Sequence, residues 1–86
     1  MTISVQNATS QAIEVAINQW GDDGNTDFFK VQPTGEESWN RTDERGFVMS
    51  LKKRGSQRPY YVQNNSSIIV YDDNVTDQGL SINPLS

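Results

Sequence analysis

The sequence predicts an all-β fold: a small antiparallel β-sandwich, or a partly open barrel, of about seven to eight short strands. Apolar and polar residues alternate in short runs, and turn-forming residues separate the runs about every ten residues. No window carries the sustained i, i+3, i+4 apolar spacing of an amphipathic helix. The 86 residues have room for one domain, expected over residues 1–86.

The alternation sets both the position and the inward face of each expected strand, because successive side chains of a strand point to opposite faces. The strands are predicted at about residues 2–6, 12–20, 28–32, 37–41, 47–52, 59–63, 68–72 and 79–83. Inward-facing residues are expected at Ile3 and Val5, at Ile13, Val15 and Ile17, at Phe47, Met49 and Leu51, at Tyr60 and Val62, and at Leu80 and Ile82.

Residues that favour turns separate these strands. Consecutive strands of an antiparallel sandwich usually reverse direction, so alternate loops lie at the same end of the domain. The end that carries loop 21–27 is called the top end. Loops 42–46 and 64–67 are also expected at the top end, and loops 7–11, 32–36, 53–57 and 72–78 at the opposite, bottom end.

The composition excludes several classes of function. The chain has no Cys and no His, which excludes disulfides, Cys/His metal sites, thiol nucleophiles and histidine general bases. Seven basic against eleven acidic residues, a net charge of -4, argue against binding of nucleic acid. No enzyme activity, cofactor or metal is expected. Asp22 and Asp23 are adjacent in a loop, with little room for a catalytic cleft, and Ser38 and Ser50 have no histidine partner.

Membrane insertion is not expected, because no apolar run approaches the roughly 20 residues of a spanning helix. The N-terminal residues have neither the basic region nor the apolar region of a secretory signal, so a cytoplasmic location is expected. The five Asn-x-Ser/Thr triplets are then attributed to a composition rich in these residues rather than to glycosylation.

One acidic phrase occurs twice, as DDGNTD at residues 22–27 and as DDNVTD at residues 72–77. It fits a paired calcium clamp, two ligand-binding loops or two ordinary turns. Five expected strands separate the two copies, and this odd number places them at opposite ends, so they cannot share one metal ion. The first copy begins like a calcium loop but has Phe28 where that loop requires Gly, which favours a polar turn.

The second copy is expected to be a counter-charge. The basic residues Lys52, Lys53, Arg54 and Arg58 lie near the bottom end, where Asp72, Asp73 and Asp77 are also predicted. Surface ion pairs of this kind contribute about 0–1 kcal/mol each.

Two tryptophans, Trp20 and Trp39, are predicted close to the rim of the top end. An indole face can cover the apolar face of a sugar ring, and neighbouring polar groups can bind its hydroxyls. We therefore predict a glycan site made of Trp20, Asp22, Asp23, Asn25, Trp39, Arg41 and Asp43. In so small a domain, however, each Trp is also a candidate core residue, whose burial stabilises the fold by about 1.5–3 kcal/mol.

Adjacent aromatic residues in strands must point to opposite faces, so one residue of each pair, Phe28/Phe29 and Tyr60/Tyr61, is expected outside the core. Tyrosine is enriched at protein interfaces, and a homo-oligomer would compensate for the small core. The alternative interaction function is a serine-protease inhibitor that presents the basic loop at residues 53–56.

Two segments resemble known proteins. Residues 3–15 followed by Trp20-Gly21, together with residues 31–41, resemble small β-sandwich proteins of mushroom-forming fungi, including the N-terminal half of aegerolysins. The resemblance implies a cytosolic binding or defence protein, either a fruiting-body lectin or a membrane-lipid binder. The chain lacks the cysteines of aegerolysins, and its acidic top end argues against anionic lipids.

Together these observations predict a non-catalytic binding protein, with a carbohydrate-binding, lectin-like or defence role first. The alternatives are a protein-interaction module, as a homo-oligomer or a protease inhibitor, and a binder of membrane lipids.

Overall fold

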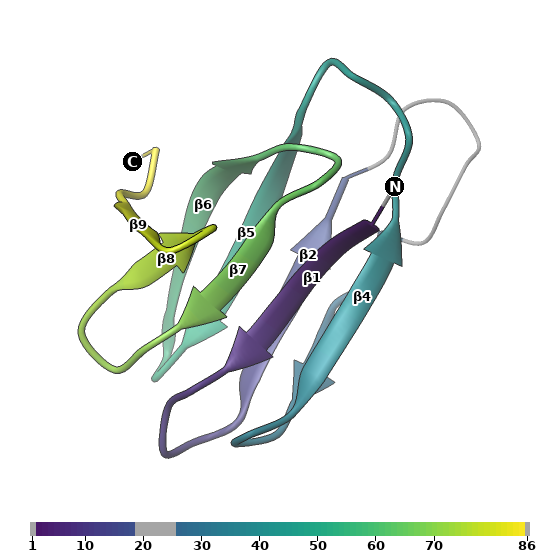
Figure 1. The fold of residues 1–86 in the computed structure, drawn as a ribbon. Coiled ribbons are helices and arrows are strands. Elements are labelled where there is room, and N and C mark those ends of the chain that lie inside the picture. Colours follow the sequence, from purple (N-terminus) through teal and green to yellow (C-terminus); the bar gives the residue numbers. More distant parts are fainter. Residues whose placement is uncertain (1, 19–25, 86) are drawn as a thin grey trace.

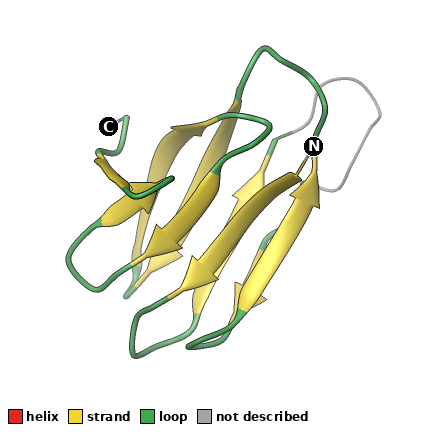
Figure 2. Cartoon of the chain, in the orientation of Figure 1, coloured by secondary structure: helices red, strands yellow, loops and turns green. Residues whose placement is uncertain are grey.

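Two β-sheets pack face to face in the computed structural model, which describes residues 2–18 and 26–85 (Figure 1). The described residues form nine strands and no helix (Figure 2). The strands are β1 (Thr2–Asn7), β2 (Ile13–Ile17), β3 (Phe29–Val31), β4 (Glu36–Asn40), β5 (Phe47–Lys53), β6 (Ser56–Val62), β7 (Ser67–Val70), β8 (Val75–Asp77) and β9 (Leu80–Ile82). The predicted all-β fold, a small β-sandwich, is confirmed.

The five-stranded sheet has the order β4-β1-β7-β8-β9, and the four-stranded sheet has the order β3-β2-β5-β6. Every strand pair is antiparallel except β1 and β7, which run parallel with Ser4 opposite Ser67. In Figure 1 the strands β4, β1, β7 and β8 lie in front of β2, β5 and β6. Within the described residues, no helix is long and apolar enough to span a membrane.

Strand β8 was not predicted, because residues 72–79 carry the acidic and glycine residues of a long turn. Only three residues form it, and two of them, Val75 and Thr76, are β-branched and buried. Its pairing with β7, with Val75 opposite Val70, returns the chain toward the top end. The turn predicted at the bottom end therefore reduces to the short connection between Val70 and Val75.

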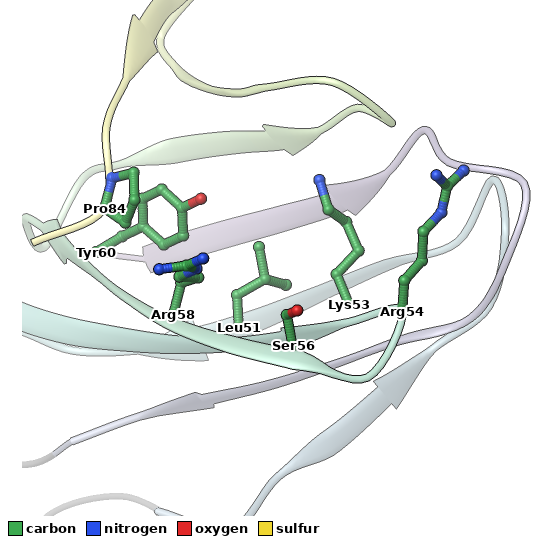
Figure 3. Close-up of a pocket in the computed structure, with 7 residues that line it drawn as sticks. All are labelled: Leu51, Lys53, Arg54, Ser56, Arg58, Tyr60 and Pro84. Carbon is green, nitrogen blue, oxygen red and sulfur yellow. The ribbon is translucent and has the colours of Figure 1, made fainter. Parts of the chain in front are cut away.

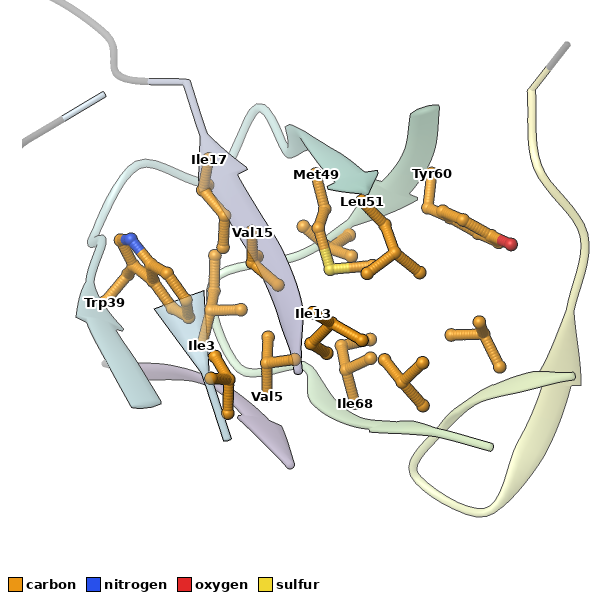
Figure 4. Close-up of a cluster of buried hydrophobic side chains, with 14 of the residues drawn as sticks. Ile3, Val5, Ile13, Val15, Ile17, Trp39, Met49, Leu51, Tyr60 and Ile68 are labelled. Carbon is orange, nitrogen blue, oxygen red and sulfur yellow. The ribbon is translucent and has the colours of Figure 1, made fainter. Parts of the chain in front are cut away.

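The core lies between the sheets and follows the predicted alternation in β1, β2, β5 and β6 (Figure 4). Its 15 buried residues are Ile3, Val5, Ile13, Val15, Ile17, Val31, Trp39, Phe47, Met49, Leu51, Tyr60, Val62, Ile68, Val70 and Val75. The prediction is wrong for Leu80 on β9, which is 74% exposed, while Ile82 packs against the core only in part. Both aromatic pairs divide as expected: Phe29 packs against this cluster while Phe28 is exposed, and Tyr60 is buried while Tyr61 is exposed.

Polar contacts join several of the loops that were predicted to share an end. At the top end, Asn64 Nδ2 donates to the carbonyl oxygen of Thr42 at 3.2 Å, which joins the β6–β7 and β4–β5 connections. At the bottom end, the buried Asn7 amide donates to the carbonyl oxygens of Gln11 and Val31, at 2.8 and 2.9 Å. Thr9 in turn donates to Asn7 Oδ1 from both its backbone N–H and its hydroxyl. The buried side-chain amide of Asn7, at the end of β1, thus forms hydrogen bonds to the end of β3 and to the segment just before β2.

Two hairpins turn through two residues each, Arg54-Gly55 between β5 and β6 and Gln78-Gly79 between β8 and β9. All four residues have positive φ, between 52° and 80° for the first three and 85° for Gly79. Positive φ at both positions is the requirement of a type I′ turn, whose twist matches that of the flanking strands. The turn at 54–55 fixes the register of β5 against β6. It therefore determines which residues lie opposite the basic side chains of the two strands.

Candidate functional site

Four of the seven residues predicted to bind a glycan, Trp20, Asp22, Asp23 and Asn25, lie outside the described residues. Their assignment to a ligand site stays a prediction. The other three, Trp39, Arg41 and Asp43, lie at the top end of β4 and in the connection that follows it.

Trp39 is a core residue in the structure. Its side chain points between the sheets, and only 4% of the residue's surface is exposed. The ring of Phe29 meets it edge to face, with 5.9 Å between ring centroids and 73° between planes. An indole that stacks on a sugar has to present its face at the surface, so the buried position of Trp39 differs from the predicted role. Its inward direction follows from its pairing with Ile3, which is also buried.

Arg41 is also buried, with 4% of its surface exposed, and it holds the top end of β2. Its Nε donates to the carbonyl oxygen of Asn18 at 3.0 Å, and its Nη2 donates to that of Ile17 at 3.0 Å. A planar guanidinium has five N–H donors in a fixed fork, which suits it to neighbouring carbonyl oxygens at a strand end. Arg41 therefore joins β4 to β2, a structural use of the donors that were predicted to bind hydroxyls.

Asp43 is engaged within its own turn. Its Oδ2 lies 2.6 Å from Arg45 Nη2, and its Oδ1 accepts from the backbone N–H of Arg45 at 2.8 Å. The side-chain hydrogen bonds from Arg45, followed by this backbone bond, lower the pKa of Asp43 from 3.8 to about 2. Trp39, Arg41 and Asp43 thus face the core, the end of β2 and the β4–β5 turn, and they do not share one binding surface.

The second acidic phrase behaves partly as predicted. Asp72 forms an ion pair with Arg54, with 2.7 Å between Oδ1 and Nη2, which confirms the counter-charge for this pair. The prediction is wrong for Asp77, which lies at the other end of β8 and accepts from the hydroxyl of Ser66 at 2.7 Å. The unpredicted strand β8 is the reason, because it carries Asp77 back toward the top end.

No group of three or more acidic side chains in residues 2–18 and 26–85 is placed to hold a metal ion. Lys52, which was expected in the same basic group, points to the outer face of the four-stranded sheet. There its Nζ lies 3.9 Å from Glu14 Oε2 and 4.0 Å from the ring centroid of Phe28.

A basic pocket opens at the bottom end, on the inner face of the β5–β6 hairpin (Figure 3). Its volume is about 510 Å³, and the residues that line it are Leu51, Lys53, Arg54, Ser56, Arg58, Tyr60 and Pro84. This set, called the basic pocket from here on, contains three cations, two hydroxyls and two apolar side chains. Among these described residues there is no carboxylate.

The register of the hairpin explains why the pocket is polar. The inward-facing pairs run from Phe47–Val62 through Met49–Tyr60 to Leu51–Arg58 and Lys53–Ser56. The same face that forms the core at the top therefore becomes cationic at the bottom. There the two sheets are joined by polar contacts, since Lys53 Nζ donates to the carbonyl oxygens of Tyr71 and Asp72 at 3.0 and 3.3 Å.

The chain after β9 forms one wall of the basic pocket. The backbone N–H of Leu85 donates to the carbonyl oxygen of Pro59 at 2.8 Å, which places Pro84 beside the edge strand β6. Pro59 has no N–H of its own, and proline is tolerated on an edge strand for this reason. Figure 3 shows Pro84 close to Tyr60, with Lys53 and Arg54 toward the opposite end of the pocket.

Burial controls the chemistry of Tyr60. Desolvation raises the pKa of its phenol, and the nearby charge of Arg58 opposes this effect. The phenol is therefore protonated at neutral pH and can both donate and accept a hydrogen bond. The Arg54 guanidinium is already paired with Asp72, and its backbone has the positive φ of the type I′ turn, 54°. This tight turn differs from the extended segment by which an inhibitor loop imitates a protease substrate.

Reasoning from the sequence missed the basic pocket, although a signal was present. The alternation of Phe47, Met49 and Leu51 continues to Lys53, and that of Val62 and Tyr60 continues to Arg58. Following the inner face beyond its last apolar residue would have placed two cations side by side. Comparisons of the chain with protein families, with curated proteins and with solved structures find no match.

Proposed function

We propose that this domain is a non-catalytic binding module that holds an anionic ligand in the basic pocket. The observation that carries the proposal is the convergence of Lys53, Arg54 and Arg58 on one hollow of about 510 Å³. Pockets of roughly 300–1,000 Å³ are typical for small ligands. The site supplies cations, hydroxyl donors and apolar walls, which are the elements of binding rather than of bond cleavage.

Electrostatics support an anionic rather than a neutral ligand. The chain as a whole carries a net charge of -4, yet the walls of this hollow carry three positive side chains and one neighbouring acid, Asp72. A cleft lined by one sign of charge concentrates ligands of the opposite sign. Hydrogen bonds from Lys and Arg to a carboxylate, sulfate or phosphate are also stronger than those between neutral groups.

The carbohydrate ligand expected from the sequence is compatible with this pocket in one form. A neutral sugar would leave the ammonium of Lys53 without an anionic partner, whereas an acidic saccharide supplies one. Carboxylated or sulfated sugars are therefore the saccharides to test, together with simple organic acids.

The test uses matched acids and neutral analogues, glucuronate against glucose and benzoate against benzamide, titrated by calorimetry and by NMR of the backbone amides. We expect the acids to bind, with shifts at Leu51, Lys53 and Tyr60, and the neutral partners to bind at least about tenfold more weakly. Lys53→Gln should weaken acid binding by about tenfold.

Lys30→Gln is the control, since it removes the same charge from exposed Lys30 on β3, at the opposite edge of the four-stranded sheet. The proposal fails if no acid binds, or if the two lysine variants affect binding equally.

A further inference from the structure

We infer that the top end carries a second ligand site, independent of the basic pocket, which binds a neutral saccharide against the exposed ring of Tyr61. The proposal goes beyond the binding of anions at the bottom end. It rests on the position of this ring, on the amide groups beside it and on the balance of charge around it.

Tyr61 lines two hollows at the top end. The smaller one lies between the end of β2 and the start of β5, with Asn18, Arg45 and Val48 among its walls. The larger one lies between the end of β6, the β6–β7 connection and the β8–β9 hairpin, and Gln63 and Asn65 are among its walls. These two hollows, with the ring that they share, are called the Tyr61 site from here on.

The ring of Tyr61 is held in place and still reaches the surface. Its cross-strand partner is Val48 on β5. The ring also lies close over Gly46, where an added Cβ atom would be 2.6 Å from Cε1. The residue is nonetheless 48% exposed, the largest fraction among the described aromatic residues. An aromatic face can cover the C–H surface of a sugar ring, and a ring that is already fixed loses little conformational entropy on binding.

Side-chain amides beside the ring supply polar contacts. Asn18 Oδ1 accepts from the backbone N–H of Val48 at 2.8 Å, which fixes the orientation of this amide and leaves its Nδ2 as a donor. In the larger hollow, Gln63 and Asn65 are exposed. An amide has both donors and an acceptor, so it matches a sugar hydroxyl, which donates and accepts as well.

The charge around the ring favours a neutral ligand. The charged residues that line the Tyr61 site are Arg45 in the smaller hollow and Asp77 in the larger one. Arg45 is paired with Asp43, with 2.6 Å between Nη2 and Oδ2, and Asp77 accepts from the hydroxyl of Ser66 and from the N–H of Ser67. The lining therefore has one charge of each sign, and both have partners in the protein. The basic pocket, by contrast, has three cations, and only a lining of one sign concentrates charged ligands.

Two hollows on one ring indicate a ligand of more than one sugar unit. Their volumes are about 190 and about 380 Å³. Together these fall within the range of roughly 300–1,000 Å³ that is typical of ligand sites. One sugar unit in each hollow would use the shared ring and the amides of both, so a disaccharide should bind more tightly than a monosaccharide.

The experiment is an NMR titration of the wild-type protein with four neutral disaccharides: cellobiose, maltose, lactose and N,N′-diacetylchitobiose. Glucose and glucuronate are the monosaccharide and the charged probe. We expect at least one disaccharide to bind, with shifts of the backbone amides of Val48, Tyr61 and Gln63. Glucose should bind at least about tenfold more weakly at these residues, and glucuronate no more tightly than glucose.

Variants of the ring and of one amide assign the contacts. Tyr61→Ala should weaken binding of the disaccharide by about tenfold, whereas Tyr61→Phe, which keeps the aromatic face, should retain most of it. Gln63→Ala, which leaves the ring in place, should weaken binding severalfold. The control is Tyr71→Ala, since Tyr71 is also exposed, at 39%, and lines neither hollow.

The outcomes separate this inference from the proposed function. Lys53→Gln should leave disaccharide binding unchanged, and Tyr61→Ala should leave acid binding in the basic pocket unchanged. If no disaccharide binds, or if Tyr61→Ala and Tyr71→Ala have equal effects, the Tyr61 site is overturned and the basic pocket is unaffected. If Lys53→Gln abolishes disaccharide binding, the saccharide belongs to the basic pocket and the second site is wrong.

Discussion

Polar residues with structural roles account for much of the order at both ends of the domain. Arg41 binds two carbonyl oxygens at the end of β2, and Asn7 binds those of Gln11 and Val31 at the bottom end. Buried polar groups of this kind are costly to leave unpaired, by about 1–3 kcal/mol each. Their residue types alone do not distinguish a buried clamp from an exposed binding group, which is why Arg41 was predicted as a ligand residue.

Asp43 allows a prediction about pH. Its folded-state pKa of about 2 lies below the value of about 3.9 of an unperturbed Asp. The ionised form is therefore favoured by folding: its contribution is fully present above about pH 4 and is lost as the pH falls through about 2. NMR titration of the Asp43 carboxyl carbon should give a midpoint near 2, and Arg45→Gln should return it toward 3.8. Arg54→Gln, at the opposite end, should leave the midpoint in place, and an unchanged midpoint in Arg45→Gln would contradict the assignment.

At the scale of elements, the ring of exposed Tyr61 on β6 lies close to Gly46, the residue before β5. Gly46 has a φ of +90°, and a Cβ atom added to it would lie 2.6 Å from Cε1 and 2.7 Å from Cζ of Tyr61. Gly55, in the hairpin turn, has a similar φ of +80° but nothing within 4 Å of such an atom. The two glycines share the same backbone requirement and differ in steric surroundings.

Replacing each glycine by alanine should separate the two effects. Gly55→Ala should cost about 1–2 kcal/mol, the penalty of a left-handed conformation. Gly46→Ala should cost somewhat more, about 2–3 kcal/mol, because the exposed ring of Tyr61 must also move aside. Both values can be measured by urea denaturation. In the background of Tyr61→Ala, which removes the ring, the cost of Gly46→Ala should fall to that of Gly55→Ala; an undiminished cost would show that the ring is not responsible.

The strands were largely predictable and their partners were not. Alternation at Ile13, Val15 and Ile17 and at Phe47, Met49 and Leu51 identifies β2 and β5, because each buries one face over several residues. Strand β8 escapes such a pattern, since three residues are too few to show a period. The alternation could have placed Lys53 and Arg58 on the inner face, but not the hollow itself, because the hollow depends on where the opposite sheet ends and on the chain around Pro84 folding back to β6.

At the scale of the whole molecule, the sheets are joined by packing in the middle and by charge at the bottom end. The β5–β6 hairpin of one sheet contacts the β7–β8 connection of the other through the ion pair of Arg54 with Asp72 and the bonds of Lys53. This contact is solvent-exposed, so it contributes about 0–1 kcal/mol to stability. Its larger effect is on the charge that the basic pocket presents to a ligand.

Asp72→Asn should therefore change ligand preference more than stability. Loss of the carboxylate releases Arg54, so the affinity for inorganic phosphate, measured by NMR titration, should rise severalfold relative to the wild type. Asp73→Asn removes the same charge from the adjacent exposed residue and should have a smaller effect. Thermal unfolding of both variants should stay within about 1 kcal/mol of the wild type. Equal phosphate affinities in the two variants would rule out the competition between Asp72 and the ligand.

The parallel pairing of β1 with β7 has a consequence for the way the chain folds. Ser4 lies opposite Ser67, and β1 is the strand that connects β4 to the rest of its sheet. During synthesis, β1 can meet β4 early, but this sheet cannot be completed until the residues of β7 have emerged. Contacts between residues so distant in sequence are formed late and slow folding to the millisecond-to-second range. We therefore expect β1 to keep one edge unpaired until β7 is available, and this encounter of distant segments to slow folding.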